Sequence, residues 1–476
     1  MPLEAFASLD ATAQADLVRE KEVTPLELVD AAIARIETFN PVLNAVVLER
    51  FDEARRAARG PLPEGPFAGV PTLIKDILAS VAGWPTTSGS RYLRDFVPKE
   101  DSELVARLRR AGFVFLGKTN TPEFGYLPTT EPRLFGATRN PWDTRRSTGG
   151  SSGGAAAAVA TRMVPVAHAS DGGGSIRIPA SCCGLFGLKP SRGRVSLGPE
   201  LGDIMSGLVC EHVLTVSVRD SAGVLDALAG PGLGDPYYAP PPAQPFVTAL
   251  GGARPRLRIA VWGRTLSGGE VHEDVGRALA DAADLCRALG HDVREAAPEL
   301  DYALLNQAFT AVWVAGAAMT MQLYPRILGR EPGPDDIEPF SRTLAELGKA
   351  ESAATYLGSI LILQRMTRAV ARFMQDWDVI LTPTLAAPPP LLGAFEPTAD
   401  NPFLPLLRSA ELAAFTPLQN ATGQPAMNVP LHWSAAGLPI GVQFVGRYAE
   451  EATLFALGAA LEEARPWAGR RPPSAA

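Results

Sequence analysis

The sequence predicts an α/β fold built around one large, mixed and mostly parallel β-sheet. Two observations carry this prediction: apolar runs of strand length alternate with amphipathic helical segments, and capping residues or glycines mark several helix ends. Alternation of this kind along most of 476 residues is typical of strands that pair beneath crossover helices. Hydrophobic residues make up 46% of the chain, which is enough for a large core and excludes global disorder.

The first elements follow from local signals. Thr24-Pro25-Leu26-Glu27 is a capping box with proline at the first helical position, so it predicts a helix start. The short run NAVVL predicts a strand, and GVPTLIKD predicts another that runs into Lys75. DSELVARLRRAG followed by FVFLG then predicts a helix, a glycine stop and a third strand.

The same alternation continues further along the chain. AAAAVATR after Gly154 predicts an alanine-rich helix, and VPVAHA predicts a strand that leads to a run of glycines. RLRIAVWG, a helix from about Glu273, and HDVRE after Gly290 form a further βαβ unit. The proline- and glycine-rich residues 231–253 do not end this pattern, so we interpret them as a surface crossover within one domain, 1–476.

Charge and hydropathy exclude several classes of protein. The net charge of −7 provides no basic footprint for nucleic acid or for a membrane surface. The beginning of the chain lacks the basic start and apolar run of a signal peptide. The longest apolar stretch, residues 308–321, has 14 residues where a membrane span needs about 20, so it predicts a core helix or a pocket wall. We expect a cytoplasmic protein without nucleic-acid or membrane partners.

Cysteines and histidines provide no metal site. Among the four cysteines, Cys182 and Cys183 are adjacent and the other two are distant, which fits neither a disulfide framework nor zinc spacing. None of the five histidines has a partner at metal-ligand spacing or stands beside a glycine-framed serine. We therefore expect no metal and no cofactor, and a general base must come from another residue type.

Two glycine–serine clusters stand out, STGGSSGGAAAA (147–158) and SDGGGSIRIPAS (170–181). Glycines permit close backbone approach, so several N–H groups can converge on an anion such as the oxyanion of a tetrahedral intermediate. On composition alone an ordinary turn is favoured for each. The first cluster also fits G-x-S-x-G, but the apolar strand that a nucleophile elbow needs is missing before it.

Lys75 is a candidate base. It follows the apolar run GVPTLI, and burial at a strand end lowers the pKa of a lysine and favours its neutral amine. A neutral amine can act as a base where histidine is missing. An ion pair between Lys75 and the adjacent Asp76 is the alternative that this stretch alone favours.

Six blocks together resemble the amidase signature family: GVPTLIKD, GKTNTPEFG, TGGSSGGAAAAVA, SDGGGSIRIPASCCGLFGLKPSRGR, NATGQPAMNVP and GLPIGVQFVG. Matching blocks run from about residue 4 to residue 465. The resemblance implies one large domain whose central twisted sheet is covered by helices on both faces. Its expected parts are a signature core at about 60–230, the crossover 231–253, and the remainder 254–476 with a variable helical pocket region at about 300–376.

The family's Ser-cisSer-Lys triad maps onto Ser175, Ser151 and Lys75. The resemblance implies that Ser175 is the nucleophile, that Ser151 follows a cis peptide bond, and that Lys75 is the base. It also implies oxyanion-hole N–H groups on Gly172, Gly173, Gly174 and Ser175. The implied reaction is hydrolysis of an amide through an acyl-enzyme, which releases a carboxylic acid and an amine or ammonia.

The expected substrate is a small neutral or apolar amide. The block 165–194 is similar to the family's hydrolases of 6-aminohexanoate oligomers, the nylon-oligomer amidases. By position, Gly125 and Tyr126 border the scissile group and Trp313 lines the acyl pocket, although a plain core tryptophan fits position 313 equally well. The sequence leaves a homodimer open.

Two other functions also remain open. One is the glutamine amidase subunit of a tRNA-dependent amidotransferase, which needs partner surfaces and a glutamine site that we do not identify in the sequence. The other is a non-catalytic glycine nest that binds an anion, and such a module takes no covalent label from a serine reagent.

Overall fold

A computed structural model describes residues 3–252, 254–265, 267–398 and 400–473 of the chain. In this part, eleven strands form one mixed sheet in the order β1-β3-β2-β6-β8-β7-β12-β13-β11-β9-β10, and β4 and β5 form a separate pair. The strands are β1 (Val46–Glu49), β2 (Pro71–Lys75), β3 (Val114–Thr119), β4 (Arg139–Asn140), β5 (Asp143–Ser147), β6 (Val166–Asp171), β7 (Phe186–Lys189), β8 (Cys210–Thr215), β9 (Arg258–Val261), β10 (Asp292–Glu295), β11 (Val379–Pro383), β12 (Ala426–Trp433) and β13 (Pro439–Gly446).

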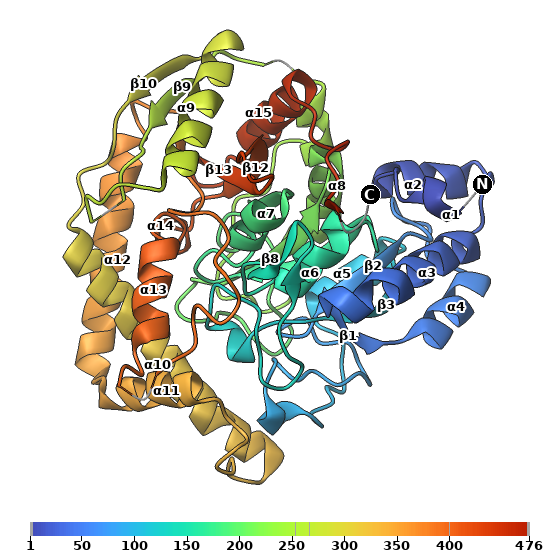
Figure 1. Cartoon of the computed structure of the whole chain (residues 1–476), viewed down its shortest axis with the longest axis horizontal. Helices are drawn as coiled ribbons and strands as arrows, with labels where there is room; N and C mark the ends of the chain where they lie inside the picture. Colours follow the sequence, from blue (N-terminus) through green and yellow to red (C-terminus); the bar gives the residue numbers. More distant parts are fainter. Residues whose placement is uncertain (1–2, 253, 266, 399, 474–476) are drawn as a thin grey trace.

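Helices surround this sheet (Figure 1). They are α1 (Leu3–Phe6), α2 (Ala11–Arg19), α3 (Pro25–Leu43), α4 (Phe51–Arg59), α5 (Glu103–Arg110), α6 (Gly153–Ala160), α7 (Arg177–Cys183), α8 (Val218–Leu228), α9 (Glu273–Ala288), α10 (Tyr302–Leu328), α11 (Pro339–Ala350), α12 (Ala353–Phe373), α13 (Leu404–Leu412), α14 (Pro417–Thr422) and α15 (Glu451–Ala464), with short 3-10 helices η1 (Arg91–Leu93), η2 (Glu123–Gly125) and η3 (Phe246–Leu250). Each helix and strand predicted from local signals is present, and Thr24 and Glu27 form the predicted capping box of α3.

Both faces of the sheet are covered, as predicted. Successive side chains of a strand point to opposite faces, and β7 shows this directly. Phe186 packs on Phe455 of α15, with ring centroids 6.4 Å apart, whereas a methyl group built on Gly187 would lie 2.8 Å from Ala180 of α7. Helices α7 and α15 therefore lie on opposite faces.

The sheet is mixed, as predicted, and its parallel pairs are confined to two runs. Pairing is parallel along β3–β2–β6 and along β11–β9–β10. The strands between these runs pair antiparallel, because β12 and β13 form a hairpin and β7 and β8 also run in opposite directions. A hairpin inside an α/β chain is invisible to a count of alternating elements, so the alternation alone overstated the parallel share.

Residues 231–253 run along the surface between α8 and β9, and their last residue, 253, lies outside the described residues. The segment is mostly exposed up to residue 245, and then Phe246 inserts beside Phe455 of α15, with ring centroids 5.7 Å apart. Phe246, near the end of this segment, therefore packs the crossover against α15, one of the helices that cover the sheet.

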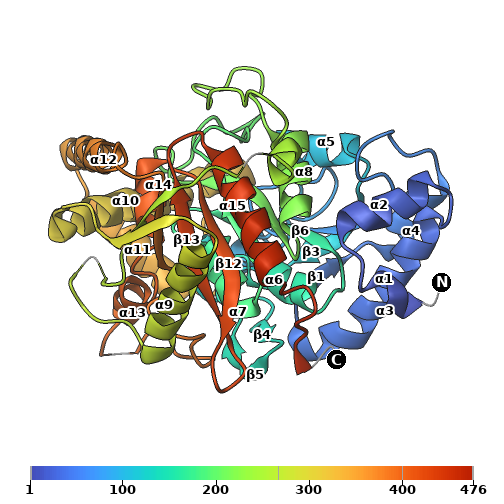
Figure 2. The ribbon, with the colours of Figure 1, turned by 90° about the horizontal axis from the view of Figure 1, so that it is seen from above.

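Helices α10 to α13 gather at the end of the molecule away from α1 to α4, in both views (Figures 1 and 2). Of the described helices, α10 is the one that is long and apolar enough to cross a membrane by length and composition. With 27 residues it is nearly twice as long as the predicted apolar run. It packs through Leu305, Ala308 and Val312 into a cluster with Leu363 and Met366 of α12. Its role in the fold is the predicted one of an apolar wall.

The sheet brings the candidate site residues to one edge. Strands β2 and β6 are parallel neighbours, so Lys75 at the end of β2 and Asp171 at the end of β6 come out at the same edge. Ser151 lies just before α6, and Ser175 lies in the turn between β6 and α7.

Candidate active site

The side chain of Lys75 is fully buried at the edge where β2 ends. Its Nζ lies 2.7 Å from Ser151 Oγ and 2.9 Å from Ser170 Oγ, within hydrogen-bonding distance of both hydroxyls. Burial lowers the pKa of Lys75 to about 7, and the carboxylates of Asp171 and Glu211 partly oppose this shift. A substantial share of the Lys75 side chains is therefore neutral near neutral pH.

Asp76 does not pair with Lys75. Its carboxylate accepts hydrogen bonds from the Thr87 backbone N–H at 3.1 Å and from Lys118 Nζ at 3.4 Å. Adjacent residues at a strand end point in opposite directions, which separates the two side chains. The structure thus removes the alternative that local sequence favoured.

A hydrogen-bonded chain of His168 and Glu211 holds the backbone of Lys75. The Lys75 backbone N–H donates to His168 Nδ1 at 3.2 Å, so the imidazole proton sits on Nε2 and faces Glu211 Oε1 at 3.1 Å. Both side chains are buried. His168 is therefore a buried core histidine with a hydrogen-bond partner at each ring nitrogen.

Ser151 follows a cis peptide bond, Gly150–Ser151, as the family resemblance implied. The segment is tightly enclosed, since a methyl group built on Gly150 would lie 2.2 Å from the Thr129 carbonyl oxygen. Ser151 itself is 3% exposed. Its hydroxyl is therefore held against Lys75, away from bulk water.

Ser175 lies at the start of the turn into α7 and lines a cavity. In the described part of the chain no hydrogen bond joins its Oγ to Ser151, so of the three side chains of the predicted triad only Lys75 and Ser151 are hydrogen-bonded to each other. The turn itself is braced by an ion pair between Asp171 and Arg177, with Arg177 Nη2 2.8 Å from Asp171 Oδ1 and both side chains fully buried. Catalytic hydrogen bonds often tighten only when substrate binds.

Three of the four predicted oxyanion-hole N–H groups are free to donate a hydrogen bond to an oxyanion. Among the described residues, the backbone N–H groups of Gly172, Gly173 and Ser175 have no acceptor. The N–H of Gly174 donates to Asp171 Oδ1 at 2.8 Å, so the expectation for Gly174 is wrong. Gly174 instead allows a left-handed turn, with φ +134°, where a methyl group would lie 2.3 Å from the Thr416 hydroxyl.

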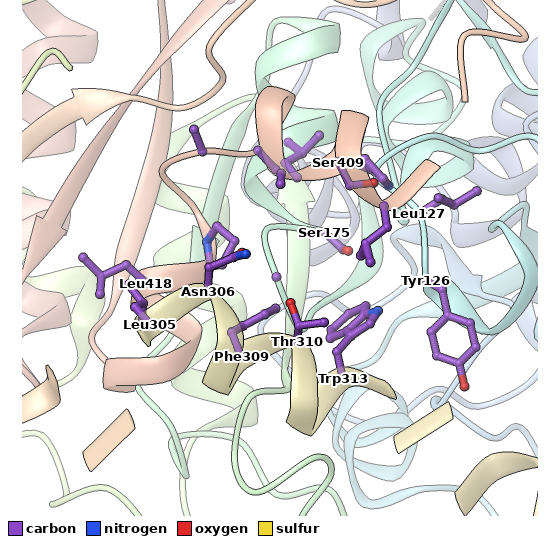
Figure 3. A pocket seen from close by; sticks show the side chains of 18 of the residues that line it. Tyr126, Leu127, Ser175, Leu305, Asn306, Phe309, Thr310, Trp313, Ser409 and Leu418 are labelled. Carbon is purple, nitrogen blue, oxygen red and sulfur yellow. The ribbon is translucent and has the colours of Figure 1, made fainter. Parts of the chain in front are cut away.

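The cavity in front of Ser175 has about 950 Å³ of empty space, part of it open to solvent (Figure 3). One wall is α10, and the opposite wall is made by α13 and the residues that lead into α14. Within the described residues, the lining contains no Asp, Glu, Lys, Arg or His side chain. Such a cavity suits an uncharged ligand, because a buried unpaired charge is costly.

The three predicted substrate-binding residues all line this cavity. A methyl group built on Gly125 would lie 3.3 Å from Ser151 Oγ, so the absence of a side chain there keeps the serine accessible. The hydroxyl of Tyr126 donates to Thr320 at 3.1 Å and points away from Ser175 (Figure 3), which leaves the ring as its contribution. Trp313 stacks on Phe309 and is part of the lining rather than a plain core residue.

Sequence reasoning missed several residues of the site. Ser170 is the second neighbour of the Lys75 amine, and it shares a face of β6 with His168 through the alternation of the strand. The expected pocket region, 300–376, is helical and supplies α10, but α12 lines no part of the cavity in the described residues. The opposite wall comes from Leu406 to Leu418, which carried no recognisable motif.

A buried lysine amine, a buried serine beside it and a second serine facing an apolar cavity define a class of protein. It is a serine hydrolase whose base is a lysine. The free backbone N–H groups of Gly172, Gly173 and Ser175 can donate hydrogen bonds to the oxyanion that forms during acyl transfer.

The chain belongs to the amidase family, whose sequence model matches residues 27–455. It is 39% identical to the 6-aminohexanoate-cyclic-dimer hydrolase of Paenarthrobacter ureafaciens, over 97% of this chain and 96% of that protein. The protein is therefore an amide hydrolase.

Solved structures agree with this assignment. A 6-aminohexanoate cyclic dimer hydrolase complexed with substrate has a TM-score of 0.94 and 37% identity, with 99% of this chain and 100% of that chain covered. A bacterial aryl acylamidase of the amidase signature family has a TM-score of 0.87 and 29% identity, with 97% of this chain and 99% of that chain covered.

Proposed function

We propose that this protein hydrolyses small uncharged amides through an acyl-enzyme on Ser175, with Ser151 and Lys75 as the proton relay. The contact between Lys75 Nζ and Ser151 Oγ, at 2.7 Å, carries the proposal. Burial lowers the pKa of Lys75 to about 7, so part of its amine is neutral at physiological pH and can accept a proton in a site that has no catalytic histidine.

The acylation step follows from this arrangement. Ser175 turns its Oγ toward Ser151 and attacks the amide carbon while its proton passes to Ser151 and the proton of Ser151 passes to Lys75. The carbonyl oxygen becomes an oxyanion that accepts hydrogen bonds from the free N–H groups of Gly173 and Ser175, and the free N–H group of Gly172 is next to them in the same turn. Ser151 then protonates the leaving nitrogen and regains a proton from Lys75, and the C–N bond breaks.

Deacylation uses the same relay in reverse. Water attacks the ester carbon while it gives a proton to Ser151, which passes its own proton to Lys75. When the ester bond breaks, the proton returns to Ser175 Oγ and the carboxylic acid leaves. The relay therefore ends each cycle with Lys75 neutral again.

The proposed substrates are amides with apolar chains, of which 6-aminohexanoate oligomers are the first to test. The uncharged lining of the cavity supports this choice, as does the similarity to two hydrolases named for the 6-aminohexanoate cyclic dimer. The cavity does not favour glutamine, because its charged amino-acid group would find no charged partner there. Glutamine hydrolysis in an amidotransferase is thus the less favoured function.

A serine reagent and an amide panel test the proposal together. An active-site serine reagent should label Ser175 in the wild type and in Ser409→Ala, a cavity control, but not in Ser175→Ala. Ser175→Ala should lower kcat by about a thousandfold or more with the fold intact. Residual turnover above a few per cent would exclude Ser175 as nucleophile, and a higher kcat/KM for glutamine than for hexanamide would exclude the proposed substrate class.

We propose further that the chain acts as one domain in the cytoplasm, on a small molecule and without nucleic acid or membrane. Strand β7, before the crossover, pairs with β12 after it, which supports a single domain. A single cooperative unfolding transition is the expected result, and two separate transitions would contradict it.

A further inference from the structure

Helix α10 places the amide of Asn306 and the hydroxyl of Thr310 in a mostly apolar wall of the cavity, to which Tyr302 of the same helix also contributes. Asn306 and Thr310 are four residues apart, so they lie on the same face of the helix as Phe309 and Trp313. Asn306 is exposed and Thr310 is half-buried. Figure 3 shows both directed toward the space in front of Ser175.

Neither polar side chain is used by the protein itself. In the described part of the chain, the Asn306 amide and the Thr310 hydroxyl have no hydrogen-bond partner, whereas Ser409 on the opposite wall donates to the Pro405 carbonyl at 2.7 Å. An amide side chain offers both donors and an acceptor, and a hydroxyl offers one donor and acceptor sites. Together they can form hydrogen bonds with both the N–H and the carbonyl oxygen of an amide group in the substrate other than the one that is hydrolysed.

These side chains lie on the acyl side of the scissile bond. Ser151 protonates the leaving nitrogen and lies beside Gly125, so the leaving group extends toward Gly125 and Tyr126. Asn306 is on the other side of Ser175 from Tyr126 (Figure 3). The acyl chain therefore runs along α10 from Trp313 toward Asn306.

The spacing fits one aminohexanoyl unit. Trp313 lies against the loop of Gly172, since a methyl group built on that glycine would be 3.4 Å from its ring, so Trp313 marks the level of the oxyanion. At a rise of about 1.5 Å per residue, Thr310 is about 4.5 Å and Asn306 about 10.5 Å further along the helix axis. An extended aminohexanoyl chain carries its next amide about 7–8 Å from the scissile carbonyl, between these two levels.

We propose that Asn306 and Thr310 form a second amide-recognition site, which selects acyl groups that carry an amide one six-carbon unit beyond the scissile carbonyl. This inference rests on the proposed function, because it assigns a specificity to the same cavity. An amide that enters an apolar cavity without partners loses its hydrogen bonds to water, and these two side chains restore them. The preferred substrates are therefore oligoamides rather than simple monoamides.

Two p-nitroanilides of equal chain length test the inference. The 6-acetamidohexanoyl anilide carries the distal amide, and the nonanoyl anilide replaces it with methylenes, while both release p-nitroaniline from the same kind of bond. Asn306→Leu should lower kcat/KM for the acetamido substrate by about tenfold and leave that for the nonanoyl substrate within about twofold. Thr310→Val should change the ratio of the two values in the same direction.

Gln307→Leu is the matched control, because Gln307 is the exposed neighbour of Asn306 and does not line the cavity. It should leave both values unchanged. If a substitution at Asn306 lowers kcat/KM equally for both substrates, or for neither, the inference is overturned while the proposed function stands. Failure of the wild type to hydrolyse either anilide overturns both, and hydrolysis that survives Ser175→Ala overturns the proposed mechanism alone.

Discussion

The rate of this enzyme should fall on the acid side as Lys75 takes up a proton. Burial lowers the pKa of Lys75 to about 7, and only its neutral amine can begin the relay. With that pKa, about half of the lysine is neutral at pH 7 and about 1% at pH 5. We therefore expect kcat/KM at pH 5 to be about a hundredfold below its plateau at pH 9, with a limb that follows a single proton.

The assay is the pH profile of kcat/KM for an anilide, since this quantity reports the free enzyme. Glu211→Gln provides the directional control: the carboxylate raises the pKa of Lys75, so its loss should move the limb to lower pH. Lys75→Arg should not restore activity, because guanidinium stays charged. A flat profile from pH 5 to pH 9, with chemistry shown to be rate-limiting, would refute the neutral-lysine mechanism.

Substitutions at Gly174, Arg177 and Tyr126 test the site's architecture, and Gly172→Ala is a control for the first. Gly174→Ala should abolish activity because the added methyl group would lie 2.3 Å from the Thr416 hydroxyl. Gly172→Ala should retain measurable turnover, because its added methyl group makes contacts of 3.3 Å or more. Equal rates for the two variants would contradict this reasoning. Arg177→Met should lower the free energy of unfolding in urea by about 3–5 kcal/mol, because it leaves the Asp171 carboxylate buried without its cation. Tyr126→Phe should keep kcat/KM within about twofold, since its hydroxyl bonds a threonine of α10 outside the substrate space, and a tenfold loss would assign that hydroxyl to the substrate.

Much of the fold could be predicted because its signals are local. The capping box at Thr24 and the glycine stops mark helix ends through contacts within a few residues, so the element bounds agree closely with the structure. The direction in which strands pair is a long-range property. The antiparallel centre of the sheet, from β8 to β13, could not be derived from element alternation.

By itself, the sequence predicted the reagents: Lys75, Ser151 and Ser175 stand in blocks that resemble those of the amidase signature family, and their proposed roles follow from that resemblance. Only the tertiary structure decided which groups meet them. Ser170 reaches the Lys75 amine because β2 and β6 lie side by side, and the Gly174 N–H is taken by Asp171 because the turn folds back on that carboxylate. Hydrogen bonds act over about 3 Å, and two residues far apart in the chain come that close only when the sheet and its helices have packed.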